Sequence, residues 1–449
     1  MPHGQTPRAA PTRTNTQRFR WCAPSVAVVC AALTSRTALA FDGTSTSMWA
    51  GTWTVVALAL GYWVLHAGLT RLRRAFPLVP GVEFLLLGVI LGPLGLRVGF
   101  LDNPHRFLPL AALASAWVAF TCGTRLHLRG ISGAQRGGPR LGFLSAVVSW
   151  LAVTLLAQAA VRAWIPTLPP EHTWFVCGWL GCAAAASSSA PSVALEQHYD
   201  ITGKTPQLLD HSAAASNFVA VVGFGILTCV FRPGGEWNGR SLSPVELAVV
   251  SVGVGACLGV ILSPYLGHAE RLAGRILVLV SVVAFASGAA YWFGLSILWV
   301  NLMLGLLLIN TTLFADRVDQ VVHASTPPFT FVLRVLAGAL WVPSPWLPTL
   351  LAVAGFVLLR WLARRVSSWF VAQWMPSMRS DAGRGLLGHG SVAIALAITL
   401  RIAQDGPLVD IGYAAILFSV ILHDLVAPRG LRVMLQDAGE LRGHAEGRT

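Results

Sequence analysis

Residues 183–204 read AAAASSSAPSVALEQHYDITGK and lie in an apolar window long enough to cross a bilayer. Ser187-Ser188-Ser189-Ala190-Pro191 stands near the middle of that window. Proline removes a backbone donor and clashes with the preceding turn, so it breaks or kinks a helix. In lipid, the carbonyls freed by such a break are tolerated only where protein or a water-filled cavity satisfies them. The stretch therefore predicts an interrupted spanning helix that belongs to a site.

The composition around this stretch is that of an integral membrane protein, with the lipid bilayer as its solvent. The chain has 449 residues, of which 55% are hydrophobic and 11% charged, whereas soluble domains carry about 25% charged residues. The net charge of +13 does not indicate a nucleic-acid partner, because the arginines are scattered between apolar segments. The seven cysteines lack metal-ligand spacing, so neither a metal site nor a disulfide framework is predicted, and no cofactor is expected.

The sequence predicts three regions. Residues 1–40 are basic, then apolar, and end in Ala38-Leu39-Ala40, which is typical of a cleaved signal peptide; the alternative is a short uncleaved anchor. Residues 48–430 form an all-α transmembrane domain, and residues 431–449 a short cytoplasmic tail. Because about 20 apolar residues cross a bilayer, thirteen transmembrane helices are predicted, at 49–69, 79–97, 108–124, 141–161, 173–195, 207–231, 244–266, 275–292, 294–313, 328–342, 346–363, 386–404 and 408–427.

The positive charges orient these spans. About nineteen arginine and lysine residues follow odd-numbered spans or lie in the tail, against about five after even-numbered spans. Cytoplasmic loops carry the excess of positive charge. The sequence therefore predicts a multi-pass protein of the cell membrane, with its N-terminus outside and its C-terminus in the cytoplasm.

Thirteen spans divide into six, one and six, and a single linker span places two six-helix halves in opposite orientations, as in inverted-repeat transporters. Span 5 contains the serines and Pro191, and its counterpart, span 12, contains Gly388-His389-Gly390-Ser391. Both are interrupted by proline or glycine beside small polar residues. We expect two broken helices that cross at mid-membrane; the alternative is a pair of kinked packing helices, since small residues also favour close helix contact.

Several motifs resemble the monovalent cation:proton antiporter superfamily, particularly its cation:proton antiporter-2 branch of sodium/hydrogen and Kef-type exchangers. The resemblance covers residues 48–430 and rests on the order of its motifs. These are PGVEFLLLGVILGPLGL at 80–96, Phe120–Gly123 with Leu126 and Leu128-Arg129, Gly294-Leu295-Ser296 with Gly305–Leu308 and Asn310, and Ser189-Ala190-Pro191. The resemblance implies a secondary transporter that exchanges a monovalent cation such as sodium or potassium for protons by alternating access. A homodimer is compatible with it. A membrane enzyme is not predicted, because the spans and loops contain no paired acids, metal-ligand cluster or nucleophile motif.

The resemblance fails at the ion site. The family carries an Asp-Asp or Asn-Asp pair where this chain has Ser216-Asn217. An amide can coordinate a cation through its oxygen, but it cannot alternate between protonated and charged states. The family's lysine in the eleventh helix corresponds to Arg360 or Arg364, and an arginine stays protonated. The paired ion-site aspartates are therefore expected to be replaced.

The remaining polar residues supply candidates for the site. The ion-binding or substrate-binding candidates are Ser189, Pro191, Ser216, Asn217, His389 and Ser391. Two residues are proton-coupling candidates. Asp210 lies two helical turns before Asn217 and faces the same way, although a solvated acid at a helix start is the alternative. His389 is the second candidate, because an unperturbed histidine titrates at about 6.5, although it can instead hydrogen-bond freed carbonyls.

Charge balance is assigned to Arg334, Arg360 and Arg364. Arg334 lies in mid-span, where a charge is costly and is by default a functional candidate; its alternatives are snorkelling or pairing with an acid such as Glu83. Asp424 and His423 are interpreted as interfacial residues at the inner end of span 13. A fixed arginine beside two half-helix N-termini would also suit an anion. The alternative function is therefore a degenerate relative, either non-transporting or altered in substrate, that acts as a sensor or partner subunit.

Overall fold

The computed structural model describes residues 81–92, 107–127, 137–196, 199–201, 203, 205–231, 236–237, 240–268, 271–374 and 381–444. These residues all belong to one compact unit, residues 61–449. The predicted signal peptide and the predicted span 49–69 lie outside the described residues. The predicted total of thirteen spans therefore stays a prediction. Every predicted span from 79–97 onward contains a helix or an interrupted helix.

The first repeat and the linker span carry their helices in the order predicted from hydropathy. They are α3 (Val82–Leu91), α4 (Leu108–Thr124), α5 (Gly137–Trp164), α6 (Pro170–Ala185), α7 (Ala190–Glu196), α8 (Thr205–Phe231) and α9 (Pro244–His268). The second repeat follows as α10 (Leu272–Trp292), α11 (Ile297–Thr311), α12 (Ala315–Ala339), α13 (Trp346–Trp374), the 3-10 helix η5 (Ala382–Leu386), α14 (Gly390–Ala403) and α15 (Pro407–Asp437).

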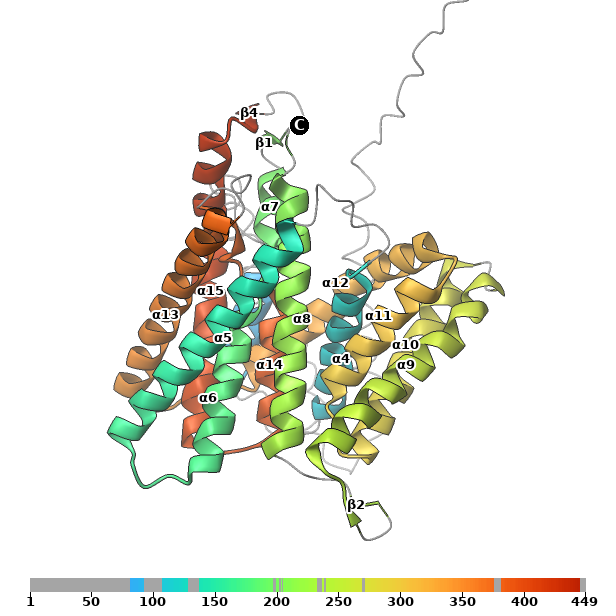
Figure 1. The fold of residues 1–449 in the computed structure, drawn as a ribbon, viewed down its shortest axis with the longest axis horizontal. Helices are drawn as coiled ribbons and strands as arrows, with labels where there is room; N and C mark the ends of the chain where they lie inside the picture. Colours follow the sequence, from blue (N-terminus) through green and yellow to red (C-terminus); the bar gives the residue numbers. More distant parts are fainter. Residues whose placement is uncertain are drawn as a thin grey trace, which may run out of the picture. The chain divides into compact units, whose positions relative to one another are not determined.

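The helices form two groups (Figure 1). The crossing bundle consists of α5, α6, α7, α8, α13, η5, α14 and α15, and the flanking bundle of α3, α4, α9, α10, α11 and α12. Spans 4 to 6 of the first repeat and spans 11 to 13 of the second together make the crossing bundle. Each repeat therefore gives its last three spans to the crossing bundle, as two inverted six-helix repeats require.

Small residues let the helices approach closely. A side chain at Gly142 of α5 would collide with the carbonyl of Ser212 on α8, and one at Gly305 of α11 with the carbonyl of Phe120 on α4. Without a hydrophobic driving force between helices in lipid, backbone-to-backbone packing of this kind is what holds them together. These two contacts fix α8 on α5 inside the crossing bundle, and α11 on α4 inside the flanking bundle.

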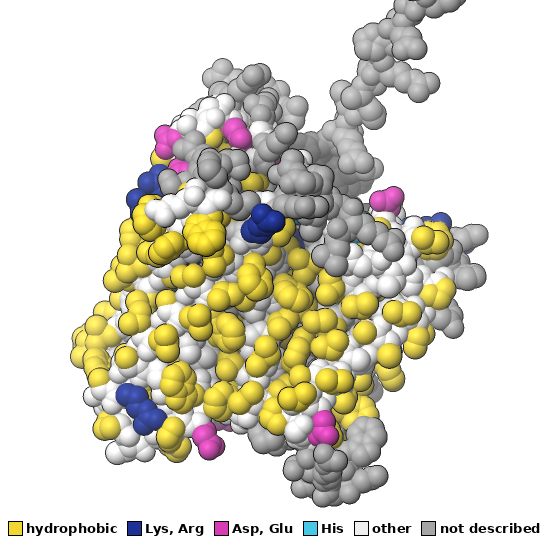
Figure 2. Space-filling model, in the orientation of Figure 1, with side chains coloured by type: hydrophobic (Ala, Val, Ile, Leu, Met, Phe, Trp, Pro, Cys, Tyr) yellow, Lys and Arg dark blue, Asp and Glu magenta, His cyan; other side chains and the backbone are white. Residues whose placement is uncertain are grey.

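The outer surface is apolar. Figure 2 shows hydrophobic side chains over most of the visible face, with charged side chains near its upper and lower margins. Six described helices are long and apolar enough to span a bilayer, and three shorter apolar helices accompany them. Leu155, Phe285 and Leu358 are among the large apolar side chains left exposed. Because lipid solvates such side chains, the chain is a multi-pass membrane protein.

Two helices extend beyond the predicted spans. α13 continues to Trp374, eleven residues past the predicted end of span 11 at 363, so Arg364 lies inside a helix instead of in a loop. α15 continues to Asp437, past the predicted start of the tail at 431. Short antiparallel strand pairs occur outside the spans, with β1 (Tyr199–Ile201) on β4 (Leu441–His444) and β2 (Glu236–Trp237) on β3 (Arg240–Ser241). The spans themselves are helical.

Candidate functional site

The first interruption lies where the serines and proline predict it. α6 ends at Ala185, residues 186–189 are non-helical, and α7 begins at Ala190. The amide side chain of Asn217 accepts a hydrogen bond from the backbone N–H of Ser187, at 3.0 Å. The Ser189 hydroxyl donates to Asp210 Oδ1, at 2.7 Å. Asn217 and Asp210 therefore contact the same non-helical segment, as their two-turn spacing on α8 predicts.

The second interruption crosses the first. η5 ends at Leu386, residues 387–389 are non-helical, and α14 begins at Gly390. The backbone N–H of Ser188 donates to the carbonyl of Gly388, at 2.9 Å, so the two non-helical segments are directly bonded. Gly388 also packs on Pro191. The prediction of two crossing broken helices is confirmed.

Arg360 of α13 bridges the two interruptions. Its guanidinium donates to the carbonyls of Ala184 (3.1 Å) and Ala186 (2.8 Å) on one side, and to those of Leu387 (2.6 Å) and Gly388 (3.2 Å) on the other. The side chain is fully buried. The last carbonyls of a helix lack intrahelical partners and carry partial negative charge. Arg360 therefore helps to satisfy the freed carbonyls on both sides of the crossing, together with Arg364 and the backbone N–H of Ser188.

Arg364 lies one turn further along α13 and binds carbonyls at the same, C-terminal end of α6. It donates to the carbonyl of Ala185 and, more weakly, to its two neighbours. It also donates to Ser145 Oγ at 2.6 Å and to Ser216 Oγ at 3.4 Å. Ser216 in turn donates to the carbonyl of Gly142. The spacing of the sequence does not decide between Arg360 and Arg364, and both are buried against the first interruption.

Acidic groups approach this site from two sides. Asp210 lies at its margin, where its half-exposed side chain pairs with Arg125 at 3.9 Å. The bonds of Asn217 and Ser216 in the described part of the chain run to backbone groups and Arg364 rather than to an acid. Asp210 nevertheless reaches the first interruption through Ser189, so it is more than a solvated acid at a helix start.

The second acid is Asp424 of α15, and its interpretation as interfacial is wrong. Asp424 is 1% exposed and its neighbour His423 is 5% exposed. Asp424 Oδ2 lies 4.0 Å from Arg334 Nη2 of α12, and the carboxyl interacts with the backbone N–H of His389. Arg334 is thus buried beside an acid instead of snorkelling. The signal that could have found Asp424 is its place in an apolar span, since ionisable residues inside a membrane are functional candidates by default.

His389 is completely buried at the second interruption. Its ring stacks on Phe356 of α13, with centroids 5.8 Å apart, and meets the His423 ring edge-on at 5.5 Å. Among the described residues, neither ring nitrogen of His389 has a hydrogen-bond partner, so its side chain does not satisfy the freed carbonyls there. Ser391 lies half-buried in the first turn of α14. The structure thus brings His389 to a histidine and an acid from span 13, rather than to Asp210.

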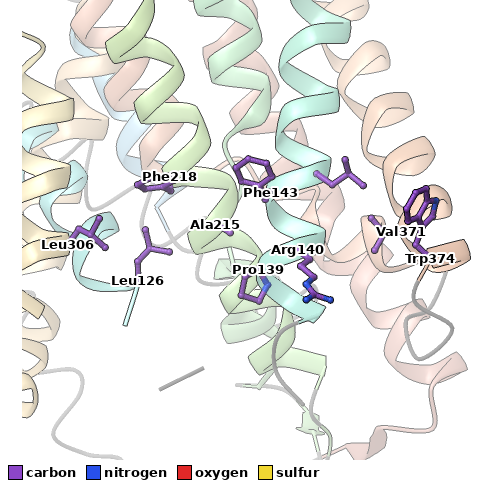
Figure 3. Close-up of a pocket in the computed structure, with 10 residues that line it drawn as sticks. Leu126, Pro139, Arg140, Phe143, Ala215, Phe218, Leu306, Val371 and Trp374 are labelled. Carbon is purple, nitrogen blue, oxygen red and sulfur yellow. The ribbon is translucent and has the colours of Figure 1, made fainter. Parts of the chain in front are cut away.

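A cavity of about 680 Å³ opens between the two bundles. The lining residues are Leu126, Pro139, Arg140, Phe143, Leu144, Ala215, Phe218, Leu306, Val371 and Trp374 (Figure 3). Leu126 lies just after the end of α4 and Leu306 lies in α11, and both helices belong to the flanking bundle. The other lining residues lie in α5, α8 and α13 of the crossing bundle. The candidate residues do not line this largely apolar cavity, although Ala215 immediately precedes Ser216. It is therefore a gap between the two bundles and not part of the candidate site.

No family model and no curated protein matches the chain. Solved structures do match it. The structure of the sodium proton antiporter MjNhaP1 from Methanocaldococcus jannaschii at pH 8 has a TM-score of 0.61 at 18% identity, covering 86% of this chain and 98% of that chain. An electron-microscopy map of the same antiporter gives a TM-score of 0.54 at 16% identity, covering 86% of this chain and 96% of that chain. The chain therefore has the fold of a monovalent cation:proton antiporter.

Proposed function

We propose that this protein is a secondary active transporter that exchanges a monovalent cation, sodium or potassium, for protons by alternating access. The observation that carries the proposal is the direct bond between the two interruptions, Ser188 N–H to the Gly388 carbonyl, on a fold shared with a sodium proton antiporter. Broken helices that cross near the midplane place substrate sites at the repeat interface in transporters of this architecture. The proposed setting is the cell membrane, with the C-terminus in the cytoplasm.

Oxygen atoms at the crossing form the proposed cation site. The Asn217 amide oxygen, the hydroxyls of Ser189, Ser216 and Ser391, and the freed carbonyls are hard ligands suited to an alkali cation. Pro191 keeps the first segment from closing into a helix. Arg360 and Arg364 hold the carbonyls in place, and Arg334 offsets buried negative charge. Asp210 and His389 are the proton-coupling candidates that the sequence predicts.

Alternating access is proposed to be a movement of the crossing bundle against the flanking bundle. The cavity between the two groups of helices supports this, because its walls come from both. Largely rigid-body motion of one helix bundle past another exposes a fixed midplane site to each side in turn.

A homodimer is also proposed, with light scattering of the purified protein in detergent as its test.

The function is tested by reconstitution. Purified protein in liposomes loaded with a pH-sensitive dye should alkalinise or acidify the lumen when a sodium or potassium gradient is imposed, and not when a choline gradient is imposed. Proton movement driven by chloride or another small anion would replace the cation with an anion as substrate. No flux with any ion would contradict the proposal and leave the non-transporting alternative.

A further inference from the structure

The two inverted repeats place equivalent polar residues on equivalent interruptions. Span 6 (α8) presents Asn217 to the backbone N–H of Ser187 in the first interruption. In span 13 (α15), the Asp424 carboxyl interacts electrostatically with the backbone N–H of His389 in the second, without an ordinary hydrogen bond. Spans 6 and 13 occupy the same position in the two halves. The family resemblance leads us to expect a carboxyl on span 6, but span 6 has the amide of Asn217 there. Span 13, its counterpart in the second repeat, has the carboxyl of Asp424.

The surroundings of Asp424 do not resemble those of a structural ion pair. Arg334 Nη2 is 4.0 Å away, and neither carboxylate oxygen makes a hydrogen bond of ordinary geometry to any residue that the structure describes. A buried ion pair that serves stability needs excellent geometry and further hydrogen bonds to repay its desolvation. Asp424 is 1% exposed and has neither. Its position in the membrane interior is therefore costly, as functional ionisable residues in membranes are.

The charged and titratable groups around Asp424 come from several elements. Arg334 of α12 and Arg360 of α13 act on it electrostatically, and His389 contacts it through its backbone N–H. His423 adjoins it on α15 and faces the His389 ring. The His423 Nδ1 atom is engaged with the Ser419 carbonyl at 2.9 Å and hydroxyl at 3.0 Å. Further along α15, Arg384 of η5 approaches the helix at Gly430.

We infer that Asp424 is the proton-binding group of this protein, with the His389 imidazole as the neighbouring group in the proton path; this rests on the proposed function. A proton from solvent adds to the carboxylate and gives a neutral carboxyl. When a monovalent cation enters the crossing, the carboxyl releases its proton, and the negative charge returns beside Arg334 and Arg360. One positive charge arrives and one leaves, so the net charge of the buried site is unchanged. Arg360 connects the two events because it contacts both interruptions and acts on Asp424.

Asp210 is less suited to this task. Its side chain is about half exposed and pairs with Arg125 at the margin of the site. A group that remains open to one side of the membrane cannot hold a proton apart from that side while the bundles move. Asp424 is 1% exposed, with Arg334 of α12, Arg360 of α13 and His389 beside α14 near it, and meets that requirement.

The test compares Asp424→Asn with Asp437→Asn, an exposed acid on the same helix. In dye-loaded proteoliposomes, Asp424→Asn should reduce cation-driven proton flux to the level of empty liposomes, and Asp437→Asn should leave it unchanged. Asp424→Glu keeps the carboxyl and should retain flux with a displaced pH profile, which separates loss of the proton site from loss of folding. Cation-driven, pH-dependent flux that is the same in Asp424→Asn and the parent would overturn the inference while the proposed function stands.

If the parent protein moves no protons, a second measurement tests whether Asp424 binds a proton. Difference infrared spectroscopy over a pH series should show a carbonyl band of a protonated carboxyl that disappears on raising the pH. The band should be absent in Asp424→Asn and present in Asp437→Asn. A titrating carboxyl band identical in Asp424→Asn and the parent, or no such band in the parent, would overturn the inference.

Discussion

Arg360 and Arg364 carry a role that neither the composition nor the family resemblance specifies. Together they donate to carbonyls at the end of α6 and, through Arg360, to carbonyls before α14. Arginine suits this position better than lysine, because its planar guanidinium presents five donors in a fixed fork. Two permanent positive charges also repel a cation, so a titratable acid must lie near. Asp424 and Asp210 provide that charge.

Replacing Arg360 by methionine should destabilise the protein strongly. The change removes four buried hydrogen bonds to carbonyls, three of which keep a second donor, and each buried acceptor left unsatisfied costs about 1–3 kcal/mol. The midpoint of thermal unfolding in detergent should fall well below that of Arg365→Met, whose exposed side chain lies over Trp361 on the same helix. Equal midpoints for the two variants would contradict the bridging role, and Arg360→Lys should fall between Arg360→Met and the parent.

Asp210→Asn should change cation uptake more than stability. The substitution keeps an oxygen for the Ser189 hydroxyl, and the exposed pair with Arg125 contributes only about 0–1 kcal/mol. Loss of a negative charge at the margin should raise the cation concentration for half-maximal flux, and added salt should shrink the difference by screening. The matched change Asp316→Asn, an exposed acid in the first turn of α12, should have no such effect. If the cation concentration for half-maximal flux did not change, or changed equally at low and high salt, Asp210 would not lie on the route by which the cation enters.

Sequence reasoning finds some of these residues and misses others for a physical reason. The two-turn spacing of Asp210 and Asn217 predicts a shared face because helix geometry is local. Asp424 escapes the same reasoning, since Arg334 and His389 are far away in the chain and lie near it only because α14 packs on both α15 and α12. Hydropathy also ends the predicted span 13 at residue 427, where the apolar run ends. Asp424 then falls near the predicted membrane boundary, although α15 continues to Asp437.

The interrupted helices are the element whose form the sequence predicts best. Proline, glycine and consecutive serines are strong local signals, and they occur in two spans that the six-one-six division makes equivalent. The conformation also depends on one position: Gly390 has φ +72°, in the left-handed region, and a side chain there would lie 2.7 Å from Ser188 Cβ. What the sequence does not specify is that the two segments bond to each other, since that depends on how α6 and α14 are packed.

Gly390→Ala should therefore separate the two interruptions. A left-handed conformation costs a residue with a side chain about 1–2 kcal/mol, before any clash with Ser188. Cation-driven flux should be lost or greatly reduced, and thermal stability should fall. Gly355→Ala on α13 is the matched control, because its side chain would meet open space and alanine stabilises a helix interior by about 0.5–1 kcal/mol. Undiminished flux in Gly390→Ala would show that the close contact of the two segments is dispensable.

At the scale of the whole molecule, the two repeats build one crossing bundle and one flanking bundle. The count of apolar segments predicts the number and order of the described spans, because polar segments are costly to place in lipid. The division into bundles is not readable from hydropathy, since lipid-facing and bundle-facing helices are equally apolar. It follows instead from glycine contacts such as Gly142 on Ser212.

The most direct test of the account compares two buried amides, one at the crossing and one remote from it. Asn217 contacts the first interruption, whereas Asn301 of α11 bonds to Ser287 and to the Ile297 carbonyl within the flanking bundle. Sodium- or potassium-driven proton flux into dye-loaded proteoliposomes should be abolished by Asn217→Ala and retained by Asn301→Ala, at matched protein density in the liposomes. Full flux in Asn217→Ala would contradict the claim that the crossing of the two broken helices is the site of exchange.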